Sequence, residues 1–137
     1  MALADDQMRR YSRHLLLPEL GGIAQAKLAA GAIAIARMDA AGQTATLYLA
    51  AAGVGRIVVT DEGTVDAPGP LFEAEDVGRS CREATARRVA QLNGDAQVVA
   101  AAEGALPLDV TGEGVPGFGA GAAAARRALR ALAGVPS

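Results

Sequence analysis

The sequence contains one candidate nucleophile, Cys81, and the residues around it determine which chemistry it could perform. Arg79 and Arg82 flank it at the start of an expected helix, and cations at a helix N-terminus favour the reactive thiolate. A nucleophilic cysteine also needs a base, but the only histidine, His14, falls in a separate segment and fits a packed or surface residue. The alternative is an inert thiol. A single cysteine also excludes an intrachain disulfide and a cysteine-rich zinc site.

Acidic residues follow two expected strands, where a parallel sheet would bind a ligand. Asp39 comes after the apolar run 32–36, and Asp61 comes directly after the run 56–60. Open parallel sheets bind ligands at the carboxyl ends of their strands. Asp61 therefore has two interpretations, a ligand contact and an ordinary polar residue at the end of a strand.

The elements that position these residues begin with a βαβ unit. The runs AIAIA (32–36) and RIVVT (56–60) are typical of short strands in a buried parallel sheet. Between them, a turn through Asp39 and Gly42 opens a helix, and one of the next two glycines closes it. Such a unit crosses over in the right-handed sense, so its loops meet at one edge of the sheet.

Helical spacing, apolar runs and the positions of proline and glycine predict the other elements. The predicted helices are 5–17, a short helix that ends near Leu28, 79–92 and 122–133. The predicted strands are 96–101 and 106–110, and a glycine-rich loop covers 112–121. Pro107 would confine the fourth strand to a sheet edge or a strand start, because proline has no N–H to donate. Three arginines on the last helix form a basic ridge, as on a solvated face: Arg126, Arg127 and Arg130.

Composition limits the classes of function. The chain of 137 residues fits one domain, and its hydrophobic content of 51% is largely alanine, which predicts a thin core and favours a partner surface. The net charge of −2 gives no basis for nucleic-acid binding. No apolar run reaches the roughly 18 residues that span a bilayer, and the N-terminus lacks the order of a signal peptide. We therefore expect a cytoplasmic protein without a membrane partner.

Three stretches, in order along the chain, carry a family pattern. They are RYSRHLLLPELG (10–21), LYLAAAGVGRIVVTDEGTVD (47–66) and DVGR (76–79), the last followed by a helix that ends in LN (92–93). Together they resemble the ThiF/MoeB/HesA family of E1-like adenylyltransferases. Pattern and resemblance predict an α/β fold, a truncated Rossmann-like three-layer domain with a mainly parallel sheet of three to four strands and an N-terminal helix. In this single domain, 1–137, a helical arm (5–28) precedes the α/β core (32–110), and the glycine-rich loop and last helix occupy 112–133.

The resemblance implies a nucleotide site that this sequence keeps only in part. Members of the family bind ATP and Mg²⁺ and adenylate the C-terminal glycine of a ubiquitin-like sulfur carrier. The family's glycine-rich loop falls on 37–42, where only Gly42 matches, while Arg37 and Asp39 place side chains near the nucleotide. Asp61 matches the acidic residue that holds the ribose. Gly42 and Asp61 are thus the two vestigial candidates for cofactor binding.

The residues that the family uses on the phosphates are replaced. Its asparagine and arginine fall on Gly69 and Phe72, and its lysine falls on Cys81. Nearby Arg79 or Arg82 would not replace an ammonium without reshaping the site. The metal-binding aspartate and the later cysteine regions have no clear counterpart. We therefore expect no catalytic residue within the chain, no metal and no bound cofactor.

Arg13 matches the family's arginine finger, which reaches the partner's ATP across a dimer interface. The alternative is a solvated helix face shared with Arg9 and Arg10.

Three hypotheses of function follow. The first is a non-catalytic partner or scaffold that forms a heterodimer with an active E1-like homologue or binds a ubiquitin-like carrier. The second is an adenylyltransferase that uses ATP and Mg²⁺ in a rearranged site, and the third is a structural homodimerising module.

Overall fold

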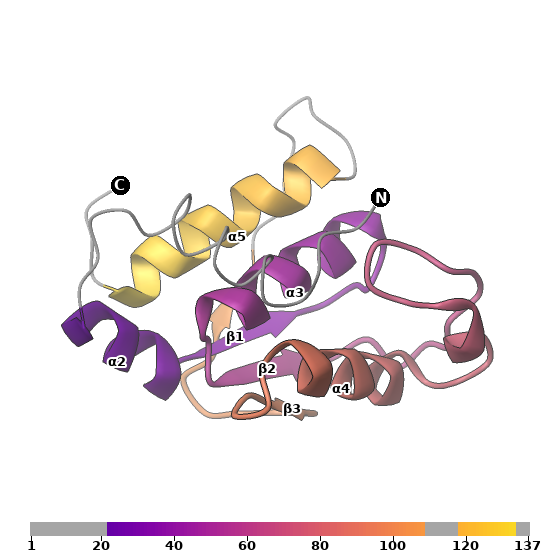
Figure 1. Ribbon diagram of the computed structural model, residues 1–137, viewed down its shortest axis with the longest axis horizontal. Helices are drawn as coiled ribbons and strands as arrows, with labels where there is room; N and C mark the ends of the chain where they lie inside the picture. The colour runs from indigo at the N-terminus through magenta and orange to yellow at the C-terminus, as the bar shows by residue number, and fades with distance from the viewer. Residues whose placement is uncertain (1–21, 109–117, 134–137) are drawn as a thin grey trace.

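A four-stranded parallel sheet forms the centre of the protein (Figure 1). The computed structural model describes residues 22–108 and 118–133. The strands are β1 (Ala32–Ile35), β2 (Arg56–Val59), β3 (Gln97–Val99) and β4 (Leu106–Pro107), in the order β3-β2-β1-β4. Each neighbouring pair is parallel. The predicted α/β fold with a mainly parallel sheet of three to four strands is confirmed.

The strand order creates a switch point beside β1. The chain moves from β1 to β2 to β3 in one direction and then returns to β4 on the other side of β1. Where the direction of strand order changes, the loops at the carboxyl ends of the strands diverge and leave a crevice. The loop that follows β1 borders this crevice, and the loop that follows β2 lies beside it at the same edge of the sheet.

Four α-helices accompany the sheet. They are α2 (Gly22–Ala30), α3 (Ala40–Ala52), α4 (Cys81–Leu92) and α5 (Phe118–Ala133), and a single 3₁₀ turn, η1 (Ala74–Asp76), precedes α4. Helix α3 lies between α4 and α5 and contacts both (Figure 1). This middle position explains why residues 42–52 of α3 are all buried, since a helix that is apolar on all sides requires neighbours on all sides.

Small residues allow α5 to lie close to α3. A Cβ added to Gly121 would lie 2.4 Å from the carbonyl oxygen of Ala41 and 2.8 Å from the Cβ of Thr44. A residue with a side chain at position 121 would prevent this close approach. Gly121 belongs to α5 rather than to the predicted loop, which corrects the sequence prediction. Helix α5 starts at Phe118 rather than at residue 122, so the end of the predicted glycine-rich loop belongs to the helix.

Other boundaries also differ from the sequence prediction. Helix α4 starts at Cys81 rather than at residue 79, because the Ser80 side chain accepts the N–H of Glu83 and caps the helix. Strands β3 and β4 are shorter than the predicted runs 96–101 and 106–110. Pro107 lies in an edge strand, as predicted. The predicted helix over 5–17 and most of the loop over 112–121 lie outside the described residues.

Candidate functional site

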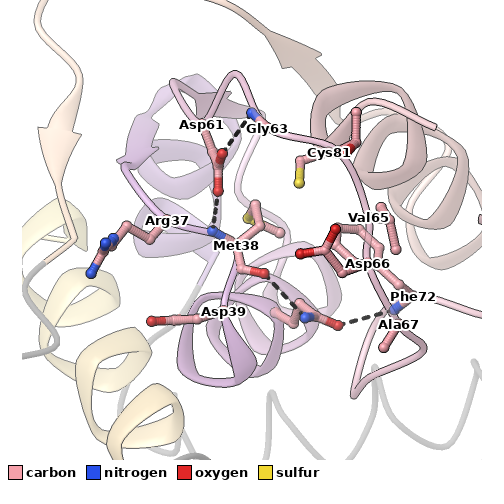
Figure 2. A pocket seen from close by; sticks show the side chains of 12 residues that line it. Arg37, Met38, Asp39, Asp61, Gly63, Val65, Asp66, Ala67, Phe72 and Cys81 are labelled. Atoms are coloured by element: carbon pink, nitrogen blue, oxygen red, sulfur yellow. Dashed lines mark hydrogen bonds between the residues drawn. The ribbon is translucent and has the colours of Figure 1, made fainter. Parts of the chain in front are cut away.

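A cavity of about 600 Å³ lies where the loops after β1 and β2 meet (Figure 2). Its walls combine apolar side chains with three carboxylates and one guanidinium. The lining residues are Arg37, Met38, Asp39, Gln43, Asp61, Gly63, Thr64, Val65, Asp66, Ala67, Phe72 and Cys81. This size falls within the roughly 300–1,000 Å³ of small-molecule sites. The sequence-predicted candidates Arg37, Asp39, Asp61 and Cys81 are therefore brought together around one cavity.

The N-terminus of α3 opens at this cavity and carries its own anion. Asp39 is the N-cap, and its carboxylate accepts the backbone N–H of Gly42 at 2.9 Å. Free N–H groups at a helix N-terminus form a natural phosphate site. Here the amide of Gly42 already donates to a negatively charged side chain of the same chain. A phosphate bound to this amide would have to displace the Asp39 carboxylate.

Gly42 has a packing role that does not depend on a ligand. A Cβ at this position would lie 2.0 Å from the carbonyl oxygen of Arg37, far inside any real contact. The last glycine of a dinucleotide-binding loop likewise allows close packing of helix and strand. The retention of Gly42 is therefore explained by the β1–α3 turn alone.

Asp61 joins the two loops that form the cavity. Its Oδ2 accepts the N–H of Met38 at 2.8 Å, and its Oδ1 accepts the N–H of Gly63 at 2.8 Å (Figure 2). The hydrogen bond from Met38, then that from Gly63, lowers the pKa of Asp61, and the positive charge of Arg37 adds to this. Each oxygen keeps a further lone pair, so a hydroxyl group could still donate to it. The geometry thus allows both interpretations of Asp61.

Gln43 is a site residue that the sequence analysis missed. Its side chain is buried, with Nε2 donating to the Met38 carbonyl at 3.1 Å and Oε1 accepting the N–H groups of Leu71 and Phe72 at 3.2 Å each. A Cβ on Gly69 would lie 2.5 Å from Oε1. Gln43 thus fixes the loop before α4 to the start of α3. A glutamine in an alanine-rich helix gave no signal of this contact.

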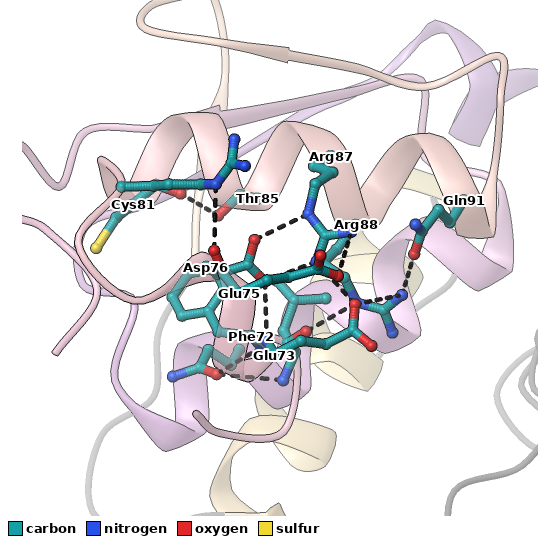
Figure 3. Close-up of polar contacts among 12 residues, drawn as sticks. Phe72, Glu73, Glu75, Asp76, Cys81, Thr85, Arg87, Arg88 and Gln91 are labelled. Atoms are coloured by element: carbon teal, nitrogen blue, oxygen red, sulfur yellow. Dashed lines mark hydrogen bonds and ion pairs between the residues drawn. The ribbon is translucent and has the colours of Figure 1, made fainter. Parts of the chain in front are cut away.

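A second set of contacts fixes the same loop to α4 (Figure 3). Arg87 donates two hydrogen bonds to the fully buried Asp76, from Nε to Oδ1 at 2.8 Å and from Nη2 to Oδ2 at 2.9 Å. Arg87 also pairs with Glu73 at 2.7 Å. The hydrogen bond from Arg87 lowers the pKa of Asp76. Arg88 donates to the Leu71 carbonyl at 2.8 Å. The loop that borders the cavity is therefore held from both sides.

Cys81 lines the cavity as an unactivated thiol. It is buried, and its pKa is raised by desolvation and by the negative charges of Asp61 and Asp66.

The two arginines near Cys81 in the sequence contact other groups. Arg82 donates to the Val59 carbonyl at 3.0 Å and pairs with Glu62. Arg79 donates to the Glu75 carbonyl at 3.4 Å. Because these cations do not lower its pKa, the nucleophile hypothesis for Cys81 gains no support from the geometry.

The charge of the cavity is predominantly negative. Asp39, Asp61 and Asp66 contribute three carboxylates, against one guanidinium from Arg37. Among the described residues, no three acidic, histidine or cysteine side chains are grouped as metal ligands. Arg13 and His14 lie outside the described residues, so the position of the arginine finger stays a prediction.

Comparison with known proteins identifies the family. A model of the ThiF family matches residues 11–111. The chain belongs to the ThiF family. The adenylyltransferase and sulfurtransferase MOCS3 of Mus musculus is 39% identical over 103 residues, which cover 72% of this chain and 22% of the relative. The sulfur carrier protein ThiS adenylyltransferase of Escherichia coli is 35% identical over 113 residues, which cover 80% of this chain and 43% of the relative.

Solved structures extend the likeness to the fold. The E. coli tRNA N6-threonylcarbamoyladenosine dehydratase TcdA superposes with a TM-score of 0.55 at 24% identity, over 68% of this chain and 39% of that protein. E. coli MccB with ATP gives a TM-score of 0.52 at 24% identity, over 60% of this chain and 26% of MccB.

The ThiF-family chain described here spans less than half the length of the two curated relatives above. The comparison therefore establishes the family and the Rossmann-like fold. Within the described residues, the helices are too short or too polar to cross a bilayer.

Proposed function

We propose that this ThiF-family chain is catalytically degenerate and acts as a non-catalytic partner or scaffold subunit. Its partner would be an active E1-like homologue or a ubiquitin-like sulfur-carrier protein. The observation that carries the proposal is the Asp39 carboxylate on the amide of Gly42. The position where a helix N-terminus would receive a phosphate is occupied by the chain's own anion.

The surroundings of that contact also oppose ATP. A triphosphate would enter a cavity with three carboxylates and one guanidinium, so unfavourable charge interactions would add to the displacement of Asp39. The loop that contacts phosphates in the family carries Gly69 and Phe72 here, and Gln43 holds it against α3. The residues present do not fit ATP and Mg²⁺, and we derive no reaction step through them.

A partner role is consistent with the family. MOCS3 and the ThiS adenylyltransferase are named for adenylation, and the latter for a sulfur-carrier protein as well. We propose that this chain pairs with such an active homologue and contributes Arg13 in trans to the partner's ATP phosphates. A guanidinium suits this role because it offers a permanent charge and several donors. A homodimer is the alternative assembly, and Arg13 would have no such role in it.

The alternative is an adenylyltransferase with a rearranged site, and the size of the cavity favours it. About 600 Å³ could hold a nucleoside, with Asp61 at the end of β2 accepting hydroxyl groups. This hypothesis requires the Asp39 cap to open and the phosphates to find cations elsewhere. It differs from the proposal in one measurable property, which is exchange of pyrophosphate into ATP.

We expect no ATP–pyrophosphate exchange from the wild-type chain or from the variant Arg37→Gly/Asp39→Gly. Two glycines would free the amide of Gly42, but they would restore neither the phosphate-contacting side chains nor the metal ligand, and such groups act as a unit. Radiolabelled exchange, with the E. coli sulfur carrier ThiS added, measures the reaction. The E. coli ThiS adenylyltransferase is the positive control. Exchange by the wild-type chain would establish the alternative, and exchange by the variant alone would show that the lost glycines were the sole defect.

A further inference from the structure

Helix α5 and the two helices that it contacts, α2 and α3, carry no acidic residues. Helices α2, α3 and α5 contain no aspartate or glutamate over their full lengths. Their charged residues are Lys27 on α2 and Arg126, Arg127 and Arg130 on α5. Since the whole chain has a net charge of −2, positive charge is concentrated on this part of the protein. The concentration is greatest on α5.

The arginines of α5 occupy one side of the helix. Successive residues of an α-helix are separated by about 100°, so these three side chains fall within an arc of about 100°. The arc runs from Arg126 through Arg130 to Arg127. Arg126 and Arg127 are exposed, and Arg130 is half-buried. Among the described residues, no acidic side chain forms an ion pair with Arg126 or Arg130.

An apolar groove begins where this arc ends. It lies between α5 and the edge strand β4, has a volume of about 210 Å³ and shares no residue with the cavity at β1 and β2. Its lining is apolar except for one arginine: Leu106, Pro107, Ala124, Arg127, Ala128 and Ala131. Arg127 thus belongs both to the groove and to the basic arc.

We propose that this surface docks an acidic segment of a partner protein, with an apolar side chain in the groove and carboxylates on the arginines. The inference rests on the proposed role as a partner subunit and adds the site and the chemistry of the contact. Charge complementarity selects an acidic occupant, because carboxylates pair well with the guanidinium fork. The apolar lining of the groove would hold the apolar side chain of that segment.

Two other occupants fit this surface less well. A nucleic acid would use the arginines, but the groove offers no aromatic side chain for a base to stack on. An added β-strand would need main-chain donors and acceptors along β4. That strand has two residues, and Pro107 cannot donate. Recognition by side chains is therefore the favoured mode.

The test uses fluorescence anisotropy with a labelled Glu-Glu-Leu-Glu-Glu peptide, and a Gln-Gln-Leu-Gln-Gln peptide of equal length as the neutral probe. We expect measurable binding of the acidic peptide and at least tenfold weaker binding of the neutral one. The variant Arg126→Gln/Arg130→Gln should weaken binding of the acidic peptide about tenfold. The matched control Arg56→Gln/Arg79→Gln removes two exposed arginines elsewhere and should change it less than twofold.

Equal weakening by both double variants would overturn the proposal, because attraction would then be non-specific. Unchanged binding in Arg126→Gln/Arg130→Gln, or no binding of the acidic peptide, would overturn it as well. Tighter binding of a labelled 20-nucleotide single-stranded DNA, lost in the same variant, would assign the surface to nucleic acid instead. No arm of the test involves ATP, so this inference and the proposed loss of ATP binding can fail separately.

Discussion

Replacing Gly42 by alanine should destabilise the protein by about 4 kcal/mol or more, the range of exceptional single substitutions. Helix propensity alone would give the opposite sign, since alanine is favoured over glycine inside a helix by up to about 1 kcal/mol. The close approach decides the outcome, because the new Cβ would lie 2.0 Å from the Arg37 carbonyl oxygen, which belongs to the backbone. Either the β1–α3 turn or the start of α3 must move. Urea unfolding followed by circular dichroism measures the change.

Gly94→Ala is the matched control. A Cβ there has no heavy atom within 4 Å and needs no left-handed backbone, so the unfolding free energy should change by less than about 0.5 kcal/mol. Equal midpoints for the two variants would show that the turn tolerates a side chain at position 42. The packing explanation for the surviving glycine would then be wrong, and its retention would point back to a ligand.

Replacing Arg13 by alanine should slow adenylation by the active partner about 100-fold or more, if the chain is the inactive half of a pair. A guanidinium that approaches the partner's phosphates would stabilise the negative charge that develops there, and such groups have effects of this size in sites that exclude water. Formation of adenylate in the mixed complex, with and without the substitution, measures the loss. Assembly should persist, because a single rim-exposed arginine contributes little to binding.

Arg9→Ala is the control for this experiment. It removes the same charge from the same predicted helix, four residues earlier in the sequence. We expect less than a threefold effect on the partner's rate. Equal and small effects of the two substitutions would leave Arg13 as a solvated surface residue, and the partner role would then rest on binding alone.

The βαβ unit could be predicted from the sequence because its signals are local. Two short apolar runs predicted β1 and β2, and the predicted turn through Asp39 and Gly42 is the observed N-cap and first turn of α3. The same local pattern placed Asp61 at the end of β2. Since both loops end at one edge of a parallel sheet, the sequence could also indicate that Asp39 and Asp61 border one cavity.

Contacts between distant segments could not be predicted in this way. Gln43 accepts the amides of Leu71 and Phe72, nearly thirty positions away. Asp76, in the 3₁₀ turn before α4, forms an ion pair with Arg87, which lies within α4. Each partner alone resembles an ordinary polar residue of a helix or loop. The early start of α5 was missed for a related reason. Glycine usually ends a helix, but Gly121 is favoured by its contact with α3, which local propensity does not contain.

The role of Asp39 also became clear only from the structure. The sequence indicated a carboxylate close to a phosphate position, and hence repulsion. The geometry adds that this carboxylate accepts the N–H of Gly42 and is therefore part of the fold. A helix N-cap of this kind stabilises a protein by about 1 kcal/mol. ATP would have to overcome this contribution as well as the unfavourable charge.

Titration of the purified chain with ATP and Mg²⁺ in a calorimeter measures whether the cavity at β1 and β2 still binds a nucleotide. We expect a dissociation constant above about 1 mM or no detectable binding, because the Asp39 cap, the carboxylates of the cavity and the replaced phosphate contacts act together. The E. coli ThiS adenylyltransferase, titrated in the same buffer, confirms that the assay detects a nucleotide site. A micromolar dissociation constant for the wild-type chain would show that the Asp39 cap and the carboxylates of the cavity do not prevent ATP binding, and the observation that carries the proposed function would be lost.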